Sequence, residues 1–477
     1  MIKCKKCNET MKRVPDILDV WVDAGTTSWT CLDYPQNEKN FKELWPADFI
    51  LEGKDQIRGW FNLLFVASMV SMNKPSYKSV YMHGFINDAQ GRKMSKSLGN
   101  YILPNEVIEK YGADTLRYYA IGGANPGLDL NYNFEDMKIK YRNLVVLWNL
   151  HKLLIDMSKG VEKPENAALK IEEDYIISKL HSTIQKTTEL FDNHQLNEIP
   201  LAVEDLFLEL SRTYIQIVRD KSATGLIQEK QAVLYAMYHV LMDSLKLFAP
   251  VCPFITEQIY QNLKEHFNLK EESIHLLEWP KADVKKINKE LEQDMEIAKN
   301  TVQSILSARD KMQRGIRWPL KQAIVETKDK NVMKAVEKLS KIIKTMAAVK
   351  EISIVEELPG VKPTIKLDYA KLKPEFGQLA PKIIANFAME STETIMRHID
   401  QDGTHTLNID GDKVEITKDH LMIEKQLPTN LVEAEFKFGA VYVDKELTPE
   451  LEAEGYSREL MRKLQSLRKK AGLGKQD

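Results

Sequence analysis

The feature that most constrains the fold is a change in the pattern of apolar residues along the chain, from alternating strand and helix patterns to helical spacing throughout. Between residues 49 and 124, short apolar runs alternate with helical stretches: the runs lie at 48–51 and 79–82, the helical patterns at 60–72 and 105–119. Strands that alternate with helices are typical of a parallel sheet. Later the spacing becomes helical throughout, as in the apolar positions Val203, Phe207, Leu210, Tyr214 and Ile217. The sequence therefore predicts an α/β part followed by an all-α bundle.

Two changes of pattern predict the domain boundaries. The cluster Gly122–Gly127 is the densest run of glycine and proline, and it places a boundary near residues 122–136. Beyond Val325 short strand patterns return, at 352–355 and 364–367 and in a hairpin signal in which Asp410-Gly411 separates two alternating runs. We expect domains at 21–136, 137–325 and 326–477, the last a small α/β domain with a basic terminal helix.

Composition excludes several classes of protein. In 477 residues, hydrophobic side chains make up 43% and charged ones 29%, with a net charge of −2, so any polyanion must be bound by a local patch. The longest strongly apolar stretch, Leu63–Met72, is shorter than a membrane span, and no secretory leader follows Met1. Four cysteines are too few for a disulfide scaffold. We expect a folded cytoplasmic protein.

The helical pattern at the C-terminus combines an apolar stripe with many basic residues. Leu460, Leu464 and Leu467 lie on one side, and the basic residues are Arg458, Arg462, Lys463, Arg468, Lys469 and Lys470. A solvated helix face and a patch for phosphate backbones both fit this pattern.

The local feature with the clearest chemistry is the loop 91–100, which glycines flank. It places Lys93 and Lys96 three residues apart, with Ser95 and Ser97 between and beside them. Attack on an α-phosphate spreads charge over nonbridging oxygens and departing pyrophosphate, and ammonium groups aimed at those atoms stabilise the transition state. The residues alone also fit an exposed basic turn.

Four segments resemble class I aminoacyl-tRNA synthetases, and the isoleucine enzymes among them. Lys93–Ser97 resembles the second signature of the class, and Glu52–Phe61 resembles the segment by which the isoleucine enzymes differ from their valine and leucine relatives. Residues 18–25 resemble the strand that re-enters the catalytic domain after the editing insertion, although Val22 and Ala24 replace the usual Phe and Ser. Arg309 with residues 315–320 resembles the end of the anticodon-binding bundle.

The resemblance implies roles for individual residues. Lys93 and Lys96 would be catalytic, and the ATP phosphates would be held by Lys93, Ser95, Lys96 and Ser97, with His83 as a further candidate. The adenylate and the amino acid would be held by Glu52, Gly53, Asp55, Gln56 and Trp60. Polar residues after a strand of a parallel sheet are where ligands bind. Without the family, Trp60 is equally a core aromatic and His83 a structural histidine.

The resemblance also implies a metal and an RNA partner. Cys4 and Cys7 form a Cys-x-x-Cys pair, which is half of a four-ligand zinc site, and the other ligands would lie upstream; incidental cysteines are the alternative. The helical domain would bind the anticodon stem-loop of tRNA, with Arg309, Arg317 and Trp318 as the candidate contacts. Trp318-Pro319 equally fits a packed helix stop.

The resembled family has parts that this sequence lacks. None of the ten histidines lies in a His-x-Gly-His signature, and the editing insertion is absent. We therefore expect residues 1–20 to be a half zinc knuckle with the exit from that insertion, and 21–136 to be the second half of a Rossmann-like catalytic domain. The chain would resemble the second half of a synthetase, trimmed at its far end.

The expected activity is ATP- and Mg²⁺-dependent activation of isoleucine to an adenylate and its transfer to tRNA(Ile), with an N-terminal half supplied in trans. Three alternatives stay open. The chain is an inert tRNA-binding module, a fragment of a longer reading frame, or a portion of a valine- or leucine-type synthetase.

Overall fold

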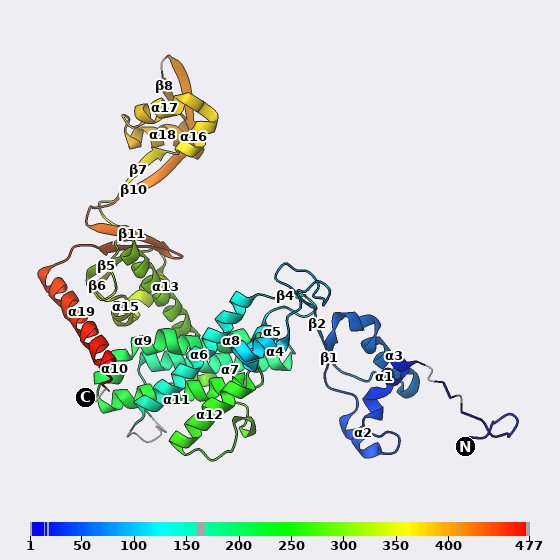
Figure 1. Cartoon of the computed structure of the whole chain (residues 1–477). Coiled ribbons are helices and arrows are strands. Elements are labelled where there is room, and N and C mark those ends of the chain that lie inside the picture. The colour runs from blue at the N-terminus through cyan, green and yellow to red at the C-terminus, as the bar shows by residue number, and fades with distance from the viewer. Residues whose placement is uncertain (1, 14, 17–18, 160–166, 410, 474–477) are drawn as a thin grey trace. The chain divides into compact units, whose positions relative to one another are not determined.

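The structure is a computed structural model that describes residues 2–13, 15–16, 19–159, 167–409 and 411–473. The chain divides into two compact units, the first ending at Asn288 and the second beginning at Lys289 (Figure 1). Each unit is described on its own below.

The first unit begins with an α/β part whose strands pair in parallel. Its elements are α1 (Val20–Thr30), α2 (Glu38–Leu44), β1 (Ile50–Gly53), the 3₁₀ turn η1 (Lys54–Arg58), α3 (Trp60–Met72), β2 (Val80–His83), β3 (Ile86–Asn87), α4 (Pro104–Tyr111), α5 (Ala113–Gly122) and β4 (Leu130–Asn131). Strand β1 pairs in parallel with β2, and β3 with β4. The predicted parallel pairing is confirmed.

Two local predictions in this part are wrong. Residues 18–25 were expected to form a strand, but the chain is helical from Val20, because Asp19 caps α1 by accepting a hydrogen bond from the Trp21 amide at 2.8 Å. Residue 18 lies outside the described residues. The helix expected over 105–119 is two helices, since Gly112 has a φ of +85° between α4 and α5.

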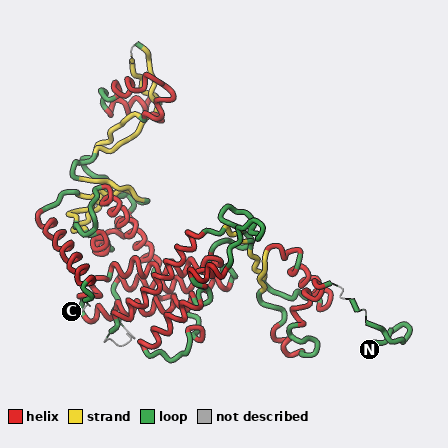
Figure 2. The backbone as a smooth tube through the Cα atoms, in the orientation of Figure 1, coloured by secondary structure: helices red, strands yellow, loops and turns green. Residues whose placement is uncertain are grey.

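The rest of the first unit is a helical bundle (Figure 2). Its helices are α6 (Phe134–Met157), α7 (Ile171–Asp192), α8 (Ile199–Glu209), a π-helical turn η2 (Leu210–Tyr214), α9 (Ile215–Ile217), α10 (Arg219–Thr224), α11 (Ile227–Phe248) and α12 (Pro253–Phe267), with short turns η3 (Ile274–Leu276) and η4 (Val284–Lys286). Val203, Phe207, Leu210 and Tyr214 are fully buried, which confirms the predicted face.

Hydrogen bonds attach the α/β part to this bundle. The carboxylate of Asp114, on α5, accepts from the backbone amide of Ile255 at 2.5 Å and from that of Phe254 at 3.4 Å. Arg117 donates to the carbonyls of Val251 at 2.9 Å and Pro250 at 3.0 Å. The first half of α5 is therefore fixed to the start of α12 and to the residues just before it.

The second unit is a mixed α/β fold, and it begins at Lys289, whereas the small α/β domain was expected to begin at residue 326. Its sheet has the order β11-β12-β5-β6. The elements around it are α13 (Lys289–Lys311), β5 (Leu320–Glu326), α14 (Lys330–Lys338), α15 (Ser340–Ala347), β6 (Val349–Val355), β11 (Leu431–Phe436), β12 (Gly439–Asp444) and α19 (Pro449–Lys470). Strands β5 and β6 are parallel and the other pairs antiparallel.

A module with its own core lies between β6 and β11 in the sequence. It contains β7 (Lys362–Leu367), α16 (Tyr369–Phe376), η5 (Gly377–Leu379), α17 (Ala380–Phe387), α18 (Thr392–Asp402), β8 (Thr404–Ile409), β9 (Asp412–Thr417), η6 (Lys418–His420) and β10 (Leu421–Gln426). The predicted hairpin is confirmed by the antiparallel pair β8–β9, although Asp410 lies outside the described residues. Among the described helices, none is long and apolar enough to cross a membrane.

Candidate active site

Polar residues meet where the parallel strands β1 and β2 end. Glu52 pairs in register with Met82, and Gly53 with His83, so the glutamate and the histidine lie at the same edge of the sheet. A Cβ at Gly53 would lie 2.6 Å from Asp55 Oδ1 and 3.4 Å from His83 Cε1, so the glycine leaves room for the Asp55 carboxylate beside the end of the strand. Glu52, Asp55 and His83 are exposed and open to a ligand.

The turn after β1 positions the next predicted residues through side-chain hydrogen bonds. Gln56 Nε2 donates to Asp55 Oδ2 at 2.8 Å, and Gln56 Oε1 accepts from the backbone amide of Trp60 at 3.0 Å. The glutamine thus holds the aspartate while it satisfies a free amide at the start of α3.

Trp60 is half-buried and held at both ends. Its indole Nε1 donates to the carbonyl of Ala24 at 3.2 Å, and its ring packs against the cluster of Ile50, Phe61 and Leu64. This packing fits the interpretation of Trp60 as a core aromatic. The exposed part of the ring is available as the wall of a pocket.

The loop 91–100 is fastened by one core residue and two polar ones. Met94 packs against the cluster that contains Val107 and Met137. Asn100 Oδ1 accepts from the Ser95 amide at 2.9 Å, and its Nδ2 donates to Asp88 Oδ2 at 2.9 Å and to the Lys93 carbonyl at 3.2 Å. The backbone of the loop is therefore ordered without using either lysine side chain.

Asp88, which sequence reasoning missed, organises this loop. The carboxylate is 5% exposed and accepts from the Arg92 amide at 2.8 Å and the Gln90 amide at 3.0 Å, besides its bonds to Asn100 and to the Arg92 side chain. These hydrogen bonds lower the pKa of Asp88 to about 2, and the bond from Asn100 has the largest effect. The signal for Asp88 in the sequence was an aspartate three residues before a glycine, a spacing typical of a tight turn. In the structure Gly91 has a φ of +78°.

The loop presents its functional groups to solvent. Lys93, Lys96 and Ser97 are exposed and Ser95 is half-buried, with the Ser95 and Ser97 hydroxyls 3.1 Å apart. Within the described part of the chain, neither lysine forms an ion pair. Two unneutralised ammonium groups and two hydroxyls on one ordered loop can bind a polyphosphate.

Replacing Asp88 by asparagine should loosen the loop, because an amide accepts fewer hydrogen bonds than a carboxylate and carries no charge for Arg92. We expect trypsin to cleave after Lys93 and Lys96 several times faster in Asp88→Asn than in the wild-type chain at neutral pH. Because the folded pKa lies below the ordinary value, the wild-type bonds persist above about pH 4 and are lost as the pH falls toward about 2. Equal cleavage rates would contradict this role for Asp88.

Cys4 and Cys7 lie in a tight turn near the N-terminus. The Asn8 amide donates to the Cys4 carbonyl at 2.9 Å, and the Cys4 amide to the Glu9 carbonyl at 2.8 Å. Hydrogen bonds from the backbone of Cys7 and of Lys6 lower the pKa of the Cys4 thiol, which favours the thiolate that binds metals. Among the described residues, no group of three or more metal-ligating side chains is present, so this turn supplies two ligands at most.

The structure does not fit the prediction that Arg309 contacts tRNA. The residue is 1% exposed, and its guanidinium donates to the carbonyls of Ala347, Ala348, Gly315 and Trp318 at 2.8–3.4 Å. Two of these carbonyls end α15, whose negative pole a cation stabilises. Sequence alone could not separate this structural arginine from an RNA contact.

Arg317 and Trp318 both contact α19. Arg317 forms an ion pair with Glu459, and the Trp318 ring lies edge-on to Tyr456 with the centroids 5.1 Å apart. A Cβ at Gly455 would lie 2.3 Å from the Trp318 ring, so only glycine permits this contact. The packed role left open for Trp318 is therefore the one that the structure supports.

Two family descriptions match the sequence. Residues 1–133 match "tRNA synthetases class I (I, L, M and V)", and residues 173–325 match "Anticodon-binding domain of tRNA ligase". The second match covers most of the helical bundle and continues into α13 and β5.

Curated relatives are similar along nearly the whole chain. The isoleucine–tRNA ligases of Thermococcus kodakarensis and Pyrococcus abyssi are each 38% identical over 98% of this chain, and that of Methanopyrus kandleri is 36% identical over 99%. The chain spans 44–46% of the length of these relatives. Among solved structures, the LeuRS–tRNA–LeuAMS complex of Agrobacterium radiobacter is 21% identical, with a TM-score of 0.48 over 60% of this chain and 36% of its own.

The parallel strands and the lysine loop lie within the first match, and most of the helical bundle lies within the second. Residues 1–133 therefore form part of a class I tRNA synthetase domain, and residues 173–325 form an anticodon-binding domain of the tRNA ligase type.

Proposed function

We propose that the chain supplies the second half of the active site of an isoleucine–tRNA ligase and part of its tRNA-binding surface. The observation that carries the proposal is the loop 91–100, which is ordered by Asp88 and Asn100 while Lys93 and Lys96 stay exposed and unpaired within the described residues. The isoleucine specificity is supported by relatives named isoleucine–tRNA ligase that are 38% identical.

In this proposal each group has one task. Lys93 and Lys96 bind the phosphates of ATP and stabilise the charge that moves onto pyrophosphate as the isoleucine carboxylate attacks the α-phosphate. Ser95 and Ser97 donate hydrogen bonds to the same phosphates. Mg²⁺, when bound to ATP, neutralises phosphate charge. Glu52, Gly53, Asp55, Gln56 and Trp60 hold the amino acid and the adenylate, and His83 lines the same edge of the sheet.

An N-terminal half would cover exposed apolar side chains and an open sheet edge. Val20 on α1 is 69% exposed and Val70 on α3 is 82% exposed, and β1 has one sheet neighbour within the described part of the chain. Parallel sheets are normally multistranded and covered on both faces. We expect these exposed apolar side chains to lie in the interface with that half.

Cys4 and Cys7 would hold one side of a structural Zn²⁺ ion. Their turn fits two thiolate ligands, and a closed site needs two more, which the missing half would supply. In this position the metal would fasten the N-terminal segment of the chain to its partner.

The test is isoleucine-dependent exchange of pyrophosphate into ATP. We expect no exchange with the purified chain, and exchange when it is mixed with the N-terminal half of a relative, such as the Thermococcus enzyme. Valine in place of isoleucine should be activated less well, by a factor of about 10 to 200, because one methylene is worth about 1–3 kcal/mol. No exchange in the mixture, with tRNA still bound by the chain, would favour an inert tRNA-binding module.

A further inference from the structure

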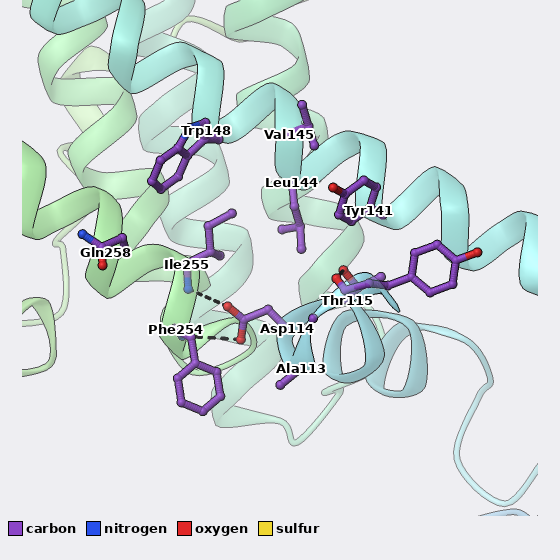
Figure 3. A pocket seen from close by; sticks show the side chains of 12 residues that line it. Ala113, Asp114, Thr115, Tyr141, Leu144, Val145, Trp148, Phe254, Ile255 and Gln258 are labelled. Carbon is purple, nitrogen blue, oxygen red and sulfur yellow. Dashed lines mark hydrogen bonds between the residues drawn. The ribbon is translucent and has the colours of Figure 1, made fainter. Parts of the chain in front are cut away.

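A cavity of about 680 Å³ lies in the first unit, apart from the lysine loop, where α5, α6 and α12 meet (Figure 3). Helix α6 contributes Tyr141, Leu144, Val145 and Trp148, which share one face because of their helical spacing. Phe254 and Gln258 of α12 lie across from them in Figure 3. The volume is within the range of about 300–1,000 Å³ that is typical of ligand sites.

The walls of the cavity are aromatic and open to solvent. Phe254 is 65% exposed and Tyr141 is 43% exposed. The rings of Tyr111 and Tyr141 meet edge-on at 5.9 Å, and Trp148 meets His151 edge-on at 4.6 Å. The neighbouring rings therefore support Tyr141 and Trp148 without stacking flat against them. One face of the Trp148 ring carries the Lys152 ammonium group, so a planar ligand would stack on the other face of Trp148 or on the ring of Tyr141.

Cations lie over two of the aromatic rings in the lining. Lys110 Nζ is 5.3 Å from the centre of the Tyr111 ring, and Lys152 Nζ is 5.5 Å from that of Trp148. Neither lysine forms an ion pair with any residue that the structure describes. The one carboxylate in the lining, Asp114, is occupied by the amides at the start of α12. The charge at the cavity thus suits an anionic ligand with an aromatic part.

We propose that this cavity binds an unstacked nucleotide of RNA, its base against Tyr141, Trp148 and Phe254 and its flanking phosphates near Lys110 and Lys152. Aromatic side chains with lysines beside them are how proteins hold single-stranded RNA, whereas an apolar peptide would leave both lysines without a partner. The inference rests on the proposed function, because it places part of the tRNA surface on α6 and α12. Gln258 is exposed and its Nε2 donates to Asn262 Oδ1 at 3.2 Å, so its amide oxygen is the group that would meet the edge of the base.

The experiment measures the affinity of the full chain for an unmodified tRNA(Ile) transcript at several salt concentrations. Tyr141→Ala and Phe254→Ala should each weaken binding about 5- to 100-fold with an unchanged salt slope, because they remove stacking but no charge. Lys110→Gln and Lys152→Gln should each lower the slope by about one. The controls are Phe65→Ala, which removes an exposed ring on α3, and Lys74→Gln, which removes an exposed lysine outside the cavity. Neither control should weaken tRNA binding or lower the salt slope.

The outcomes separate the two proposals. If the wild-type chain binds no tRNA and the mixture shows no exchange, the proposed function itself is wrong. If the wild-type chain binds tRNA and the aromatic variants, with unchanged melting temperatures, bind it equally well, the cavity is not an RNA site. Variants that keep tRNA but lose association with the N-terminal half would show that the cavity is a protein interface, which also overturns the inference.

Discussion

Lys96→Ala should lower isoleucine-dependent pyrophosphate exchange by about 10²- to 10³-fold in the enzyme reconstituted with an N-terminal half. The Lys96 side chain is exposed and has no ion-pair partner within the described residues, so its removal disturbs no packing. The loss should fall on kcat, because the ammonium group is aimed at charge that appears only as pyrophosphate departs.

Three comparisons make this prediction sharp. Lys93→Ala should also reduce exchange, since both lysines lie on the same loop. Lys74→Ala removes an exposed lysine outside the loop and should leave exchange unchanged. The affinity of Lys96→Ala for tRNA should match that of the wild-type chain. A rise in KM with kcat unchanged would mean that Lys96 binds ATP equally in the ground and transition states, which contradicts the proposed role.

Long, strongly periodic segments were predictable from sequence. The helix expected over 60–72 has the bounds of α3, and the apolar face that contains Phe207 is buried as predicted. In such segments several apolar positions in succession favour one face, so tertiary contacts reinforce the local pattern. The parallel pairing of β1 and β2 followed from the helix between them.

Short segments and single residues were less predictable, for identifiable reasons. Residues 18–25 were expected to form a strand only from their resemblance to a family segment, and the Asp19 cap decides in favour of α1. At the site, the lysine loop could be predicted but Asp88 could not, because its importance comes from the amides that the folded loop turns toward it. Arg309 shows the same limit, since sequence does not tell a buried cation from an exposed one.

Arg309→Met should destabilise the second unit by about 3 kcal/mol, because several buried carbonyl groups lose their donors at once. The guanidinium donates five hydrogen bonds to four carbonyls, which lie at the end of α15 and in the segment before β5. Burial lowers the pKa of Arg309 to about 10, so the group stays charged at neutral pH. Hydrogen exchange of peptides from β5, β6 and α15 is the measurement, since a chain with two units need not unfold in one step.

Two variants test the geometry behind this prediction. Arg309→Lys keeps the charge but has three donors on one atom, so we expect it to recover only part of the lost stability. Arg314→Met removes a half-buried arginine whose side chain donates a hydrogen bond to the Lys445 carbonyl at 2.8 Å, and it should cost less than about 1 kcal/mol. If Arg309 contacted tRNA instead, Arg309→Met would lower the salt slope of tRNA binding by about one, while hydrogen exchange of the β5, β6 and α15 peptides stayed slow. A rapid loss of protection at a constant salt slope would show that this arginine builds the fold and leaves RNA recognition to other surfaces.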